Sequence, residues 1–212
     1  MVADLLLQAL VIIVVIITFL FMYKIPQKYI SKYRATSSNS SALRARRHFI
    51  AGAQLLSKSR SSRDLSAAKL AVEEADKAIE LDPRDAASHI LKSLALEMLG
   101  LKTAAIKAID AALSPLAVKS LEDDEKGDAL YKRAELRVGV SGEERVDEAV
   151  LSDLIESVKL KGDNVKAFML LGECYERKEM NEKAMEAYES AIRVDSDHKG
   201  AREALNRLGE SR

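Results

Sequence analysis

Residues 165–198 read VKAFMLLGECYERKEMNEKAMEAYESAIRVDSDH, and this stretch decides the fold. In its first half, apolar and small residues recur at spacings of three and four, which places them on one face of a helix. These residues are Phe168, Leu171, Gly172 and Tyr175. Asn181 can cap a second helix, whose inner face carries Ala184, Tyr188 and Ala191. Gly172 and Ala184 are small where two helices must cross closely, so the stretch predicts a helix–turn–helix unit.

The same unit recurs upstream, in residues 42–83, 86–113 and 128–162. Corresponding alanines, such as Ala78, Ala112 and Ala191, are 34 residues apart, or a multiple of 34 once insertions are allowed for. In the first unit, the Ser- and Arg-rich stretch 57–63 is predicted to be the loop between the two helices. A helix–turn–helix period near 34 residues indicates a solenoid, in which each pair buries its apolar face against its neighbours.

Over residues 42–212, the chain resembles the tetratricopeptide repeat family. The last unit carries the residues that the family prefers at Phe168, Leu171, Gly172, Tyr175, Ala184, Tyr188 and Ala191, and departs from them at Ser196, where proline is usual. The first three units are degenerate, because Lys92, Arg133 and Arg137 occupy positions that are normally apolar. The resemblance implies an all-α solenoid of about four units, followed by a capping helix over residues 200–209.

The N-terminal segment is a candidate membrane span. Residues 5–23 read LLLQALVIIVVIITFLFMY, without charge, glycine or proline, and as a helix they would be about 28 Å long, close to the bilayer hydrocarbon thickness. A cleaved signal peptide would need a basic N-terminal region and a small-residue cleavage site, and both are missing here. A buried core helix would be amphipathic. We therefore predict an uncleaved single transmembrane helix within residues 1–24, which makes the lipid bilayer a partner of residues 5–23.

The formal net charge of zero conceals an uneven distribution. Residues 24–63 contain ten bases and no acid, whereas residues 64–212 contain 23 bases and 32 acids, a net charge of −9. The predicted organisation is an anchor at 1–24, a basic, Ser-rich linker at 25–41 and a repeat domain at 42–212. The acidic repeat domain argues against nucleic-acid binding, because it would repel phosphates.

Basic residues after the span predict its orientation. Lys24, Lys28, Lys32 and Arg34 place the C-terminal domain on the cytosolic side, in the endoplasmic reticulum or in the outer membrane of a mitochondrion or plastid. The sequon at Asn39 should then stay unglycosylated. The basic stretch has two interpretations: a solvated spacer that only sets topology, or an electrostatic contact with an anionic leaflet.

No catalytic motif is found in the sequence. There is no glycine-rich phosphate loop, nucleophile elbow or zinc-ligand spacing, so we predict no enzyme activity, no cofactor and no metal. The single cysteine, Cys174, lies within a predicted helix and is expected to be a buried structural thiol.

The resemblance implies that function lies in a concave groove lined by the first helix of each pair. The candidate lining residues are Ile90, Leu94, Glu97, Asp128, Tyr131, Glu135, Lys166, Met169, Glu173 and Glu176. One subgroup of the family clamps the acidic C-terminus of heat-shock chaperones through basic and amide side chains. The matching positions here are Phe49, Ala53, Leu91, Asp128 and Lys132. Only Lys132 is basic, which argues against such a clamp and favours an apolar or basic peptide ligand.

These observations predict a membrane-anchored scaffold or adaptor that binds a protein or peptide on the cytosolic side. Two alternatives stay open at this point. One is a receptor or co-chaperone at an organelle surface that handles targeting sequences or unfolded clients, for which an acidic groove would suit basic presequences. The other is an enzyme or an enzyme subunit, against which the missing motifs count.

Overall fold

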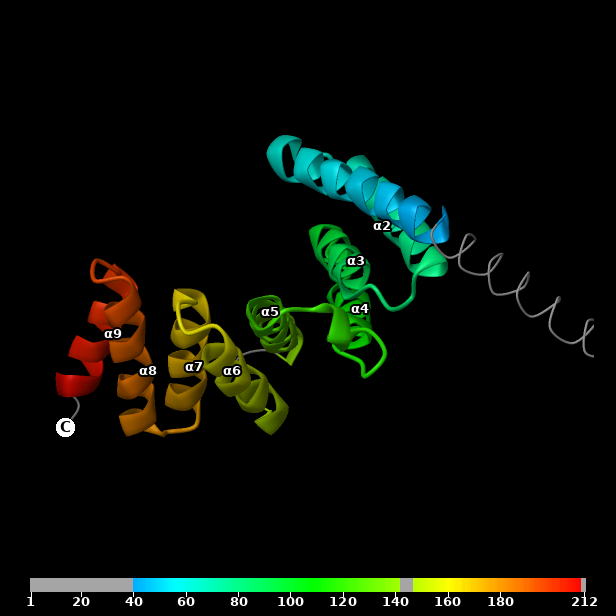
Figure 1. The fold of residues 1–212 in the computed structure, drawn as a ribbon. Helices are drawn as coiled ribbons and strands as arrows, with labels where there is room; N and C mark the ends of the chain where they lie inside the picture. Colours follow the sequence, from blue (N-terminus) through cyan, green and yellow to red (C-terminus); the bar gives the residue numbers. More distant parts are fainter. Residues whose placement is uncertain (1–39, 142–146, 211–212) are drawn as a thin grey trace, which may run out of the picture. The chain divides into compact units, whose positions relative to one another are not determined.

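A computed structural model of the chain describes residues 40–141 and 147–210, and the regular secondary structure in these ranges is helical throughout (Figure 1). By its internal contacts the chain divides into Met1–Arg44 and Ala45–Arg212. Of the first unit, only residues 40–44 are described, and they are helical, including residues 40 and 41 at the end of the predicted linker. The following paragraphs therefore concern the second unit.

The predicted anchor lies outside the described residues, as do Lys24, Lys28, Lys32, Arg34 and Asn39. Among the helices that the structure does describe, none combines the length and apolarity needed to cross a bilayer.

The helices follow one another along the chain. They comprise residues 40–62, α2 Leu65–Leu81, α3 Ala86–Met98, α4 Lys102–Ala112, the 3-10 turn η1 Val118–Ser120, α5 Asp123–Ser141, α6 Glu148–Leu160, α7 Val165–Arg177, α8 Asn181–Val194 and α9 Lys199–Glu210. Each helix packs against the next, so that residues 45–62 pair with α2, α3 with α4, α5 with α6 and α7 with α8. The predicted all-α repeat solenoid is confirmed, and α9 packs on α8 at the end of the described array.

Side chains in the preceding turns cap four of the described helices at their starts. The Asp64 carboxylate accepts a hydrogen bond from the amide of Ser66 at 2.9 Å, and Asp85 and Asn164 cap α3 and α7 in the same way at 3.2 Å. At α9, the Nδ1 of His198 accepts from the amide of Ala201 at 3.1 Å. These side chains satisfy amides that have no partner inside the helix, which stabilises each helix start.

The predicted loop at 57–63 is wrong. The first helix continues to residue 62, and only Arg63 and Asp64 separate it from α2, with Arg63 in the left-handed region at φ 54°. The small and apolar face continues through Leu56 and Ser59, which are buried. The hydroxyls of Ser61 and Ser62 donate to the carbonyl of Lys58 at 3.0 and 2.7 Å, so these serines close the last turn instead of breaking it.

The helices cross closely because their contact faces are small. Most buried hydrophobic residues in the described part of the chain are alanines. At Gly172, a Cβ would lie 2.4 Å from the ring of Tyr188, so only glycine fits there. In the second pair the corresponding small residue is Ser93, whose buried hydroxyl donates to the carbonyl of Ala105 at 2.9 Å. The degenerate units therefore keep the close crossing that the last unit achieves with glycine.

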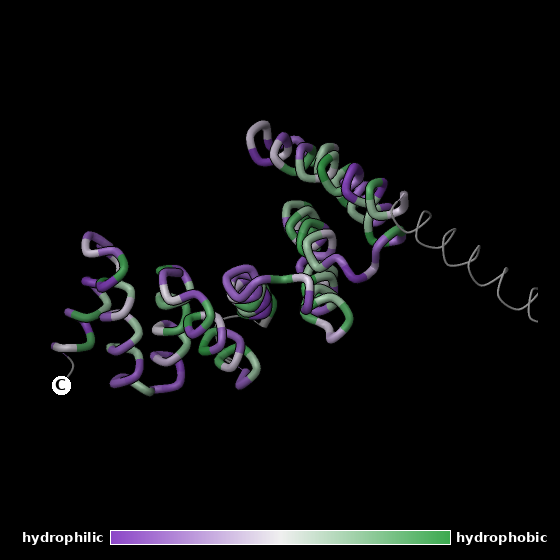
Figure 2. Tube along the Cα trace, viewed as in Figure 1, coloured by the Kyte–Doolittle hydropathy of each residue, from purple (hydrophilic) through white to green (hydrophobic). Residues whose placement is uncertain are grey.

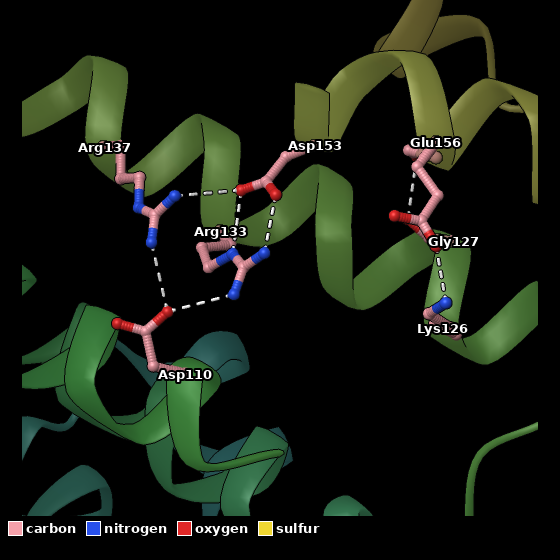
Figure 3. Close-up of polar contacts among 8 residues, drawn as sticks. Asp110, Lys126, Gly127, Arg133, Arg137, Asp153 and Glu156 are labelled. Atoms are coloured by element: carbon pink, nitrogen blue, oxygen red, sulfur yellow. Dashed lines mark hydrogen bonds and ion pairs between the residues drawn. The ribbon is translucent and has the colours of Figure 1, made fainter. Parts of the chain in front are cut away.

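In Figure 2, α5 is predominantly hydrophilic, in contrast with the preceding pair α3 and α4. The reason is an ion-pair network between three helices, drawn in Figure 3. Arg133 of α5 binds Asp153 of α6 through two hydrogen bonds of 2.6 and 2.8 Å and reaches Asp110 of α4 at 3.1 Å. Arg137, one turn further along α5, binds the same two carboxylates at 3.2 Å each. Asp153 is only 8 % exposed, so its side of the network is shielded from water, whereas Asp110 is 43 % exposed.

Lys92 also pairs with an acidic residue on a neighbouring helix. It extends from α3 to Asp76 of α2 at 2.6 Å, between the first and second pairs. The three bases at normally apolar positions thus each have an acid on a neighbouring helix, and ion pairs replace part of the apolar stacking in this array. The network also holds α5 in place, and on another face of that helix lie Tyr131 and Lys132, which line the groove.

Candidate peptide-binding groove

A groove of about 920 Å³ runs along the first helices of the pairs. It is lined by residues 49–60, α3, α5, the α6–α7 turn and the start of α7. Its apolar lining includes Phe49, Ala53, Leu56, Ile90, Leu94 and Tyr131. Except for the buried Leu56, these side chains are partly exposed and therefore available to a ligand.

Five of the ten predicted groove residues line this groove: Ile90, Leu94, Asp128, Tyr131 and Lys166. Glu97 and Glu135 do not line it, but both bind Lys132, which does. The remaining three predicted residues, Met169, Glu173 and Glu176, lie further along α7 and outside the lining.

Two of those three residues have structural partners. Met169 packs beside the cluster that joins α8 and α9. Glu176 accepts a hydrogen bond from the hydroxyl of Tyr188 at 2.6 Å and binds the guanidinium of Arg207 at 2.7 Å. Met169 and Glu176 are therefore engaged in contacts with α8 and α9.

The positive charge of the Lys132 ammonium is balanced by two carboxylates of the protein itself. It lies 2.5 Å from Glu135 and 2.9 Å from Glu97, and the hydroxyl of Tyr131 donates to Glu135 at 2.7 Å. Burial lowers the pKa of Lys132, but hydrogen bonds to the two carboxylates outweigh it and leave the pKa raised. Lys132 is therefore charged and already paired, so a peptide carboxylate would have to compete with Glu97 and Glu135 for it.

Sequence reasoning missed the part of the lining that comes from the first helix and from the α6–α7 turn. Arg60 lines the groove because the first helix extends through the stretch that had been predicted as a loop. Lys161 and Asp163 enter from the turn, and Lys161 binds Asp128 at 2.6 Å. The signal for the first helix was the spacing of Phe49, Ala53 and Leu56.

These additional residues change the predicted charge of the groove. The expected lining was apolar and acidic. In the structure, the basic lining residues are Arg60, Lys132, Lys161 and Lys166, and the acidic ones are Glu125, Asp128 and Asp163. The groove is therefore apolar with nearly balanced charges, which corrects the expectation of a preference for basic ligands.

The single cysteine is buried, as predicted: Cys174 is fully inaccessible and packs in the cluster formed by α5, α6 and α7. Burial raises the pKa of its thiol to about 11. At pH 8 only about one thiol in a thousand should be ionised, and the thiolate is the reactive form. We expect the native chain to resist maleimide labelling at pH 8 and to become labelled after unfolding in urea, as measured by mass spectrometry. Rapid labelling of the folded chain would contradict the burial.

Among the described residues, no group of three or more His, Cys, Asp and Glu side chains is arranged to hold a metal ion. The three histidines have local structural contacts. His48 Nδ1 lies 2.7 Å from Glu74, His89 Nε2 lies 3.1 Å from the carbonyl of Pro83, and His198 caps α9.

The sequence profile of the tetratricopeptide repeat matches residues 165–198, the α7–α8 unit. Comparison with curated proteins gives no match. Among solved structures, the chain is similar to PilF of Pseudomonas aeruginosa, at 17 % identity and a TM-score of 0.61, over 79 % of this chain and 70 % of that one.

Two further structures have the same fold. A crystal structure of MamA shares 19 % identity at a TM-score of 0.58, over 73 % of this chain and 82 % of that one. YrrB, described as a TPR protein with an unusual peptide-binding site, shares 19 % identity at a TM-score of 0.58, over 74 % of this chain and 73 % of that one. At these identities the likeness establishes the fold alone.

Proposed function

We propose that this chain, whose α7–α8 unit matches the tetratricopeptide repeat and whose fold is similar to that of solved repeat proteins, is a scaffold that binds a protein partner in its groove and displays it at a membrane surface. The observation that carries the proposal is the apolar groove of about 920 Å³ with partly exposed Ile90, Leu94 and Tyr131. Side chains of this kind lie at the centre of peptide-binding grooves, where they exclude water around a few anchoring residues.

The ligand that fits best is an amphipathic helix or an extended segment with apolar anchors. The paired charges at the rim, Lys161 with Asp128 and Lys132 with Glu97, allow both signs on the ligand. A receptor for basic targeting sequences would draw its selectivity from an acidic groove, and the balanced lining does not favour that alternative.

The membrane part of the proposal rests on the sequence. Residues 5–23 are uncharged and long enough to span a bilayer, and the bases that follow favour a cytosolic repeat domain. The membranes that we propose are the endoplasmic reticulum and the outer membrane of a mitochondrion or plastid. Anchoring would confine the groove to a surface and raise its effective concentration for partners at the same membrane.

Proximity labelling with the full chain tests both parts. We expect Ile90→Ala with Tyr131→Ala to weaken partner binding about tenfold or more, because both changes remove apolar anchors. The matched control is Ile155→Ala with Met180→Ala, which truncates exposed apolar residues beside another hollow, formed by α6, α7 and the turn before α8. The control should keep its partners. Thermal unfolding of each variant shows whether it is folded.

Partners that are captured equally by the groove variant and by the control would refute the groove. A chain without residues 1–24 should lose the partners that are confined to the membrane, while its groove still binds them in solution. If that truncated chain captured the same partners in cells as the full chain, the display mechanism would fail.

A further inference from the structure

The outward face of the helix at residues 45–62 is basic, and no other element that the structure describes covers it. Within the unit Ala45–Arg212, Arg46, Arg47, Ile50 and Lys58 are all exposed on this helix, and Ile50 retains 46 % of its accessible surface. None of the three bases forms an ion pair with a described residue. At 100° per residue, these four side chains fall on one side of the helix, with Gln54 at their centre.

The other faces of this helix are already in use. His48 contacts Glu74 of α2, and Gly52 packs closely enough that a Cβ there would lie 2.9 Å from Leu91. Phe49 and Ala53 point to the groove. The side that carries Arg46, Arg47 and Lys58 thus has no covering element in the part of the chain that the structure describes.

The charge of this face differs from that of the exposed side of α8. Between residues 24 and 63 there are ten bases and no acid, whereas the domain that follows has a net charge of −9. The exposed side of α8, for comparison, mixes Lys183 and Arg193 with Glu186 and Glu189. A helix face that carries only bases around a central apolar residue is suited to an anionic surface.

We propose that this outward face of the first helix, made by Arg46, Arg47, Ile50 and Lys58, docks on an anionic bilayer surface. The guanidinium groups and the ammonium would bind lipid phosphate and carboxylate groups, while Ile50 enters the headgroup region. Three bases near such a surface should strengthen the contact about a hundredfold.

The position of this face in the chain favours lipid as the occupant. The inference rests on the proposed anchor, because the 16 residues from Lys24 to Asn39 connect the predicted span to the helix and limit its distance from the span to about 50 Å. Nucleic acid is a poorer fit, because this face offers no aromatic side chain for base stacking and the domain beside it is acidic. At 100° per residue, Phe49 and Leu56 lie about 60° or more outside this face, so docking leaves their side of the groove open. Ser57, which also lines the groove, lies at the edge where the two faces meet.

The test places a single fluorophore on this face of the full chain. Gln54→Cys puts a thiol at the centre of the face, and Glu189→Cys puts one on the exposed side of α8 as the matched control. The native Cys174 is buried and should not react, so each variant carries one polarity-sensitive label. The chain is reconstituted in nanodiscs of phosphatidylcholine, either alone or with about 30 % phosphatidylserine.

We expect a blue shift of the label at position 54 in the anionic discs only. About 0.5 M NaCl should reverse the shift, because it screens the charges, and so should the combination of Arg46→Gln, Arg47→Gln and Lys58→Gln. The label at position 189 should not respond to lipid composition.

The proposal is overturned if the label at position 54 shows no blue shift in anionic discs, or the same shift in neutral discs. It is also overturned if short single-stranded DNA reverses the shift. Failure of the chain to enter either kind of disc would instead refute the anchor. Cosedimentation of the same variants with vesicles of the two lipid compositions would then decide the lipid contact, because the charge-neutralised variant should bind anionic vesicles about a hundredfold less.

Discussion

Replacing Asp153 by alanine is expected to lower the free energy of unfolding by about 3 kcal/mol or more. Asp153 is 8 % exposed and binds both Arg133 and Arg137. Its removal would leave two guanidinium groups, 19 % and 27 % exposed, with Asp110 as their only remaining carboxylate in the network. The cost therefore comes mainly from leaving two partly buried guanidinium charges without their main partner, and not from the loss of the attraction itself.

Two further variants separate this explanation from a general loss of packing. Asp110→Ala should cost less, about 1 kcal/mol, because Asp110 is 43 % exposed and water can replace it. Replacing Arg133, Arg137 and Asp153 together by Met, Leu and Leu should recover most of the stability, because no buried charge is then left unpaired and Asp110, at 43 % exposed, is solvated by water. Urea unfolding followed by circular dichroism measures all three variants. Equal losses for Asp153→Ala and Asp110→Ala would contradict the role of burial.

The second large effect is expected at Gly172. Gly172→Ala should lower the free energy of unfolding by about 2–3 kcal/mol, because the added Cβ would lie 2.4 Å from Cε1 of Tyr188. That ring cannot easily move away, since Tyr188 is 1 % exposed and its hydroxyl donates to Glu176, which is also bound by Arg207.

Gly200→Ala in α9 is the matched control. A Cβ there meets its nearest neighbours at 3.5 Å or more, and alanine has the higher helix propensity, so stability should stay unchanged or rise slightly. Thermal unfolding of the two variants should therefore diverge. A Gly172→Ala variant as stable as the wild-type chain would show that the α7–α8 crossing can widen without cost.

The fold could be predicted from the sequence where one unit kept its preferred residues. In α7 and α8 the spacing from Phe168 to Ala191 fixed both helices and their contact. The degenerate pairs were found only by their period. Their normally apolar positions hold bases such as Arg133, and their acidic partners lie on other helices, so the pairing of Arg133 with Asp153 could not be deduced from local pattern.

The groove was predicted in part for a similar reason. Ile90, Leu94 and Tyr131 follow from the resemblance to the tetratricopeptide repeat, which implies a groove along the first helix of each pair, here α3 and α5. The contributions of Arg60 and Lys161 depend on where a helix ends and how a turn folds back, and helix ends are the least predictable part of a helix. Serines 61 and 62 resembled a loop in composition, yet their hydroxyls bond back to Lys58 within the helix.

The ion-pair network between α4, α5 and α6 also bears on how the array assembles. Helix pairs with alanine-rich contact faces resemble one another, so one pair could stack on the wrong neighbour, or on a second chain, with little apolar penalty. Arg133 and Arg137 find both carboxylates only when α5 lies between Asp110 and Asp153. The network thus favours one position of the third pair in the array. Its loss should therefore increase domain-swapped oligomers, even under conditions where the monomer remains folded.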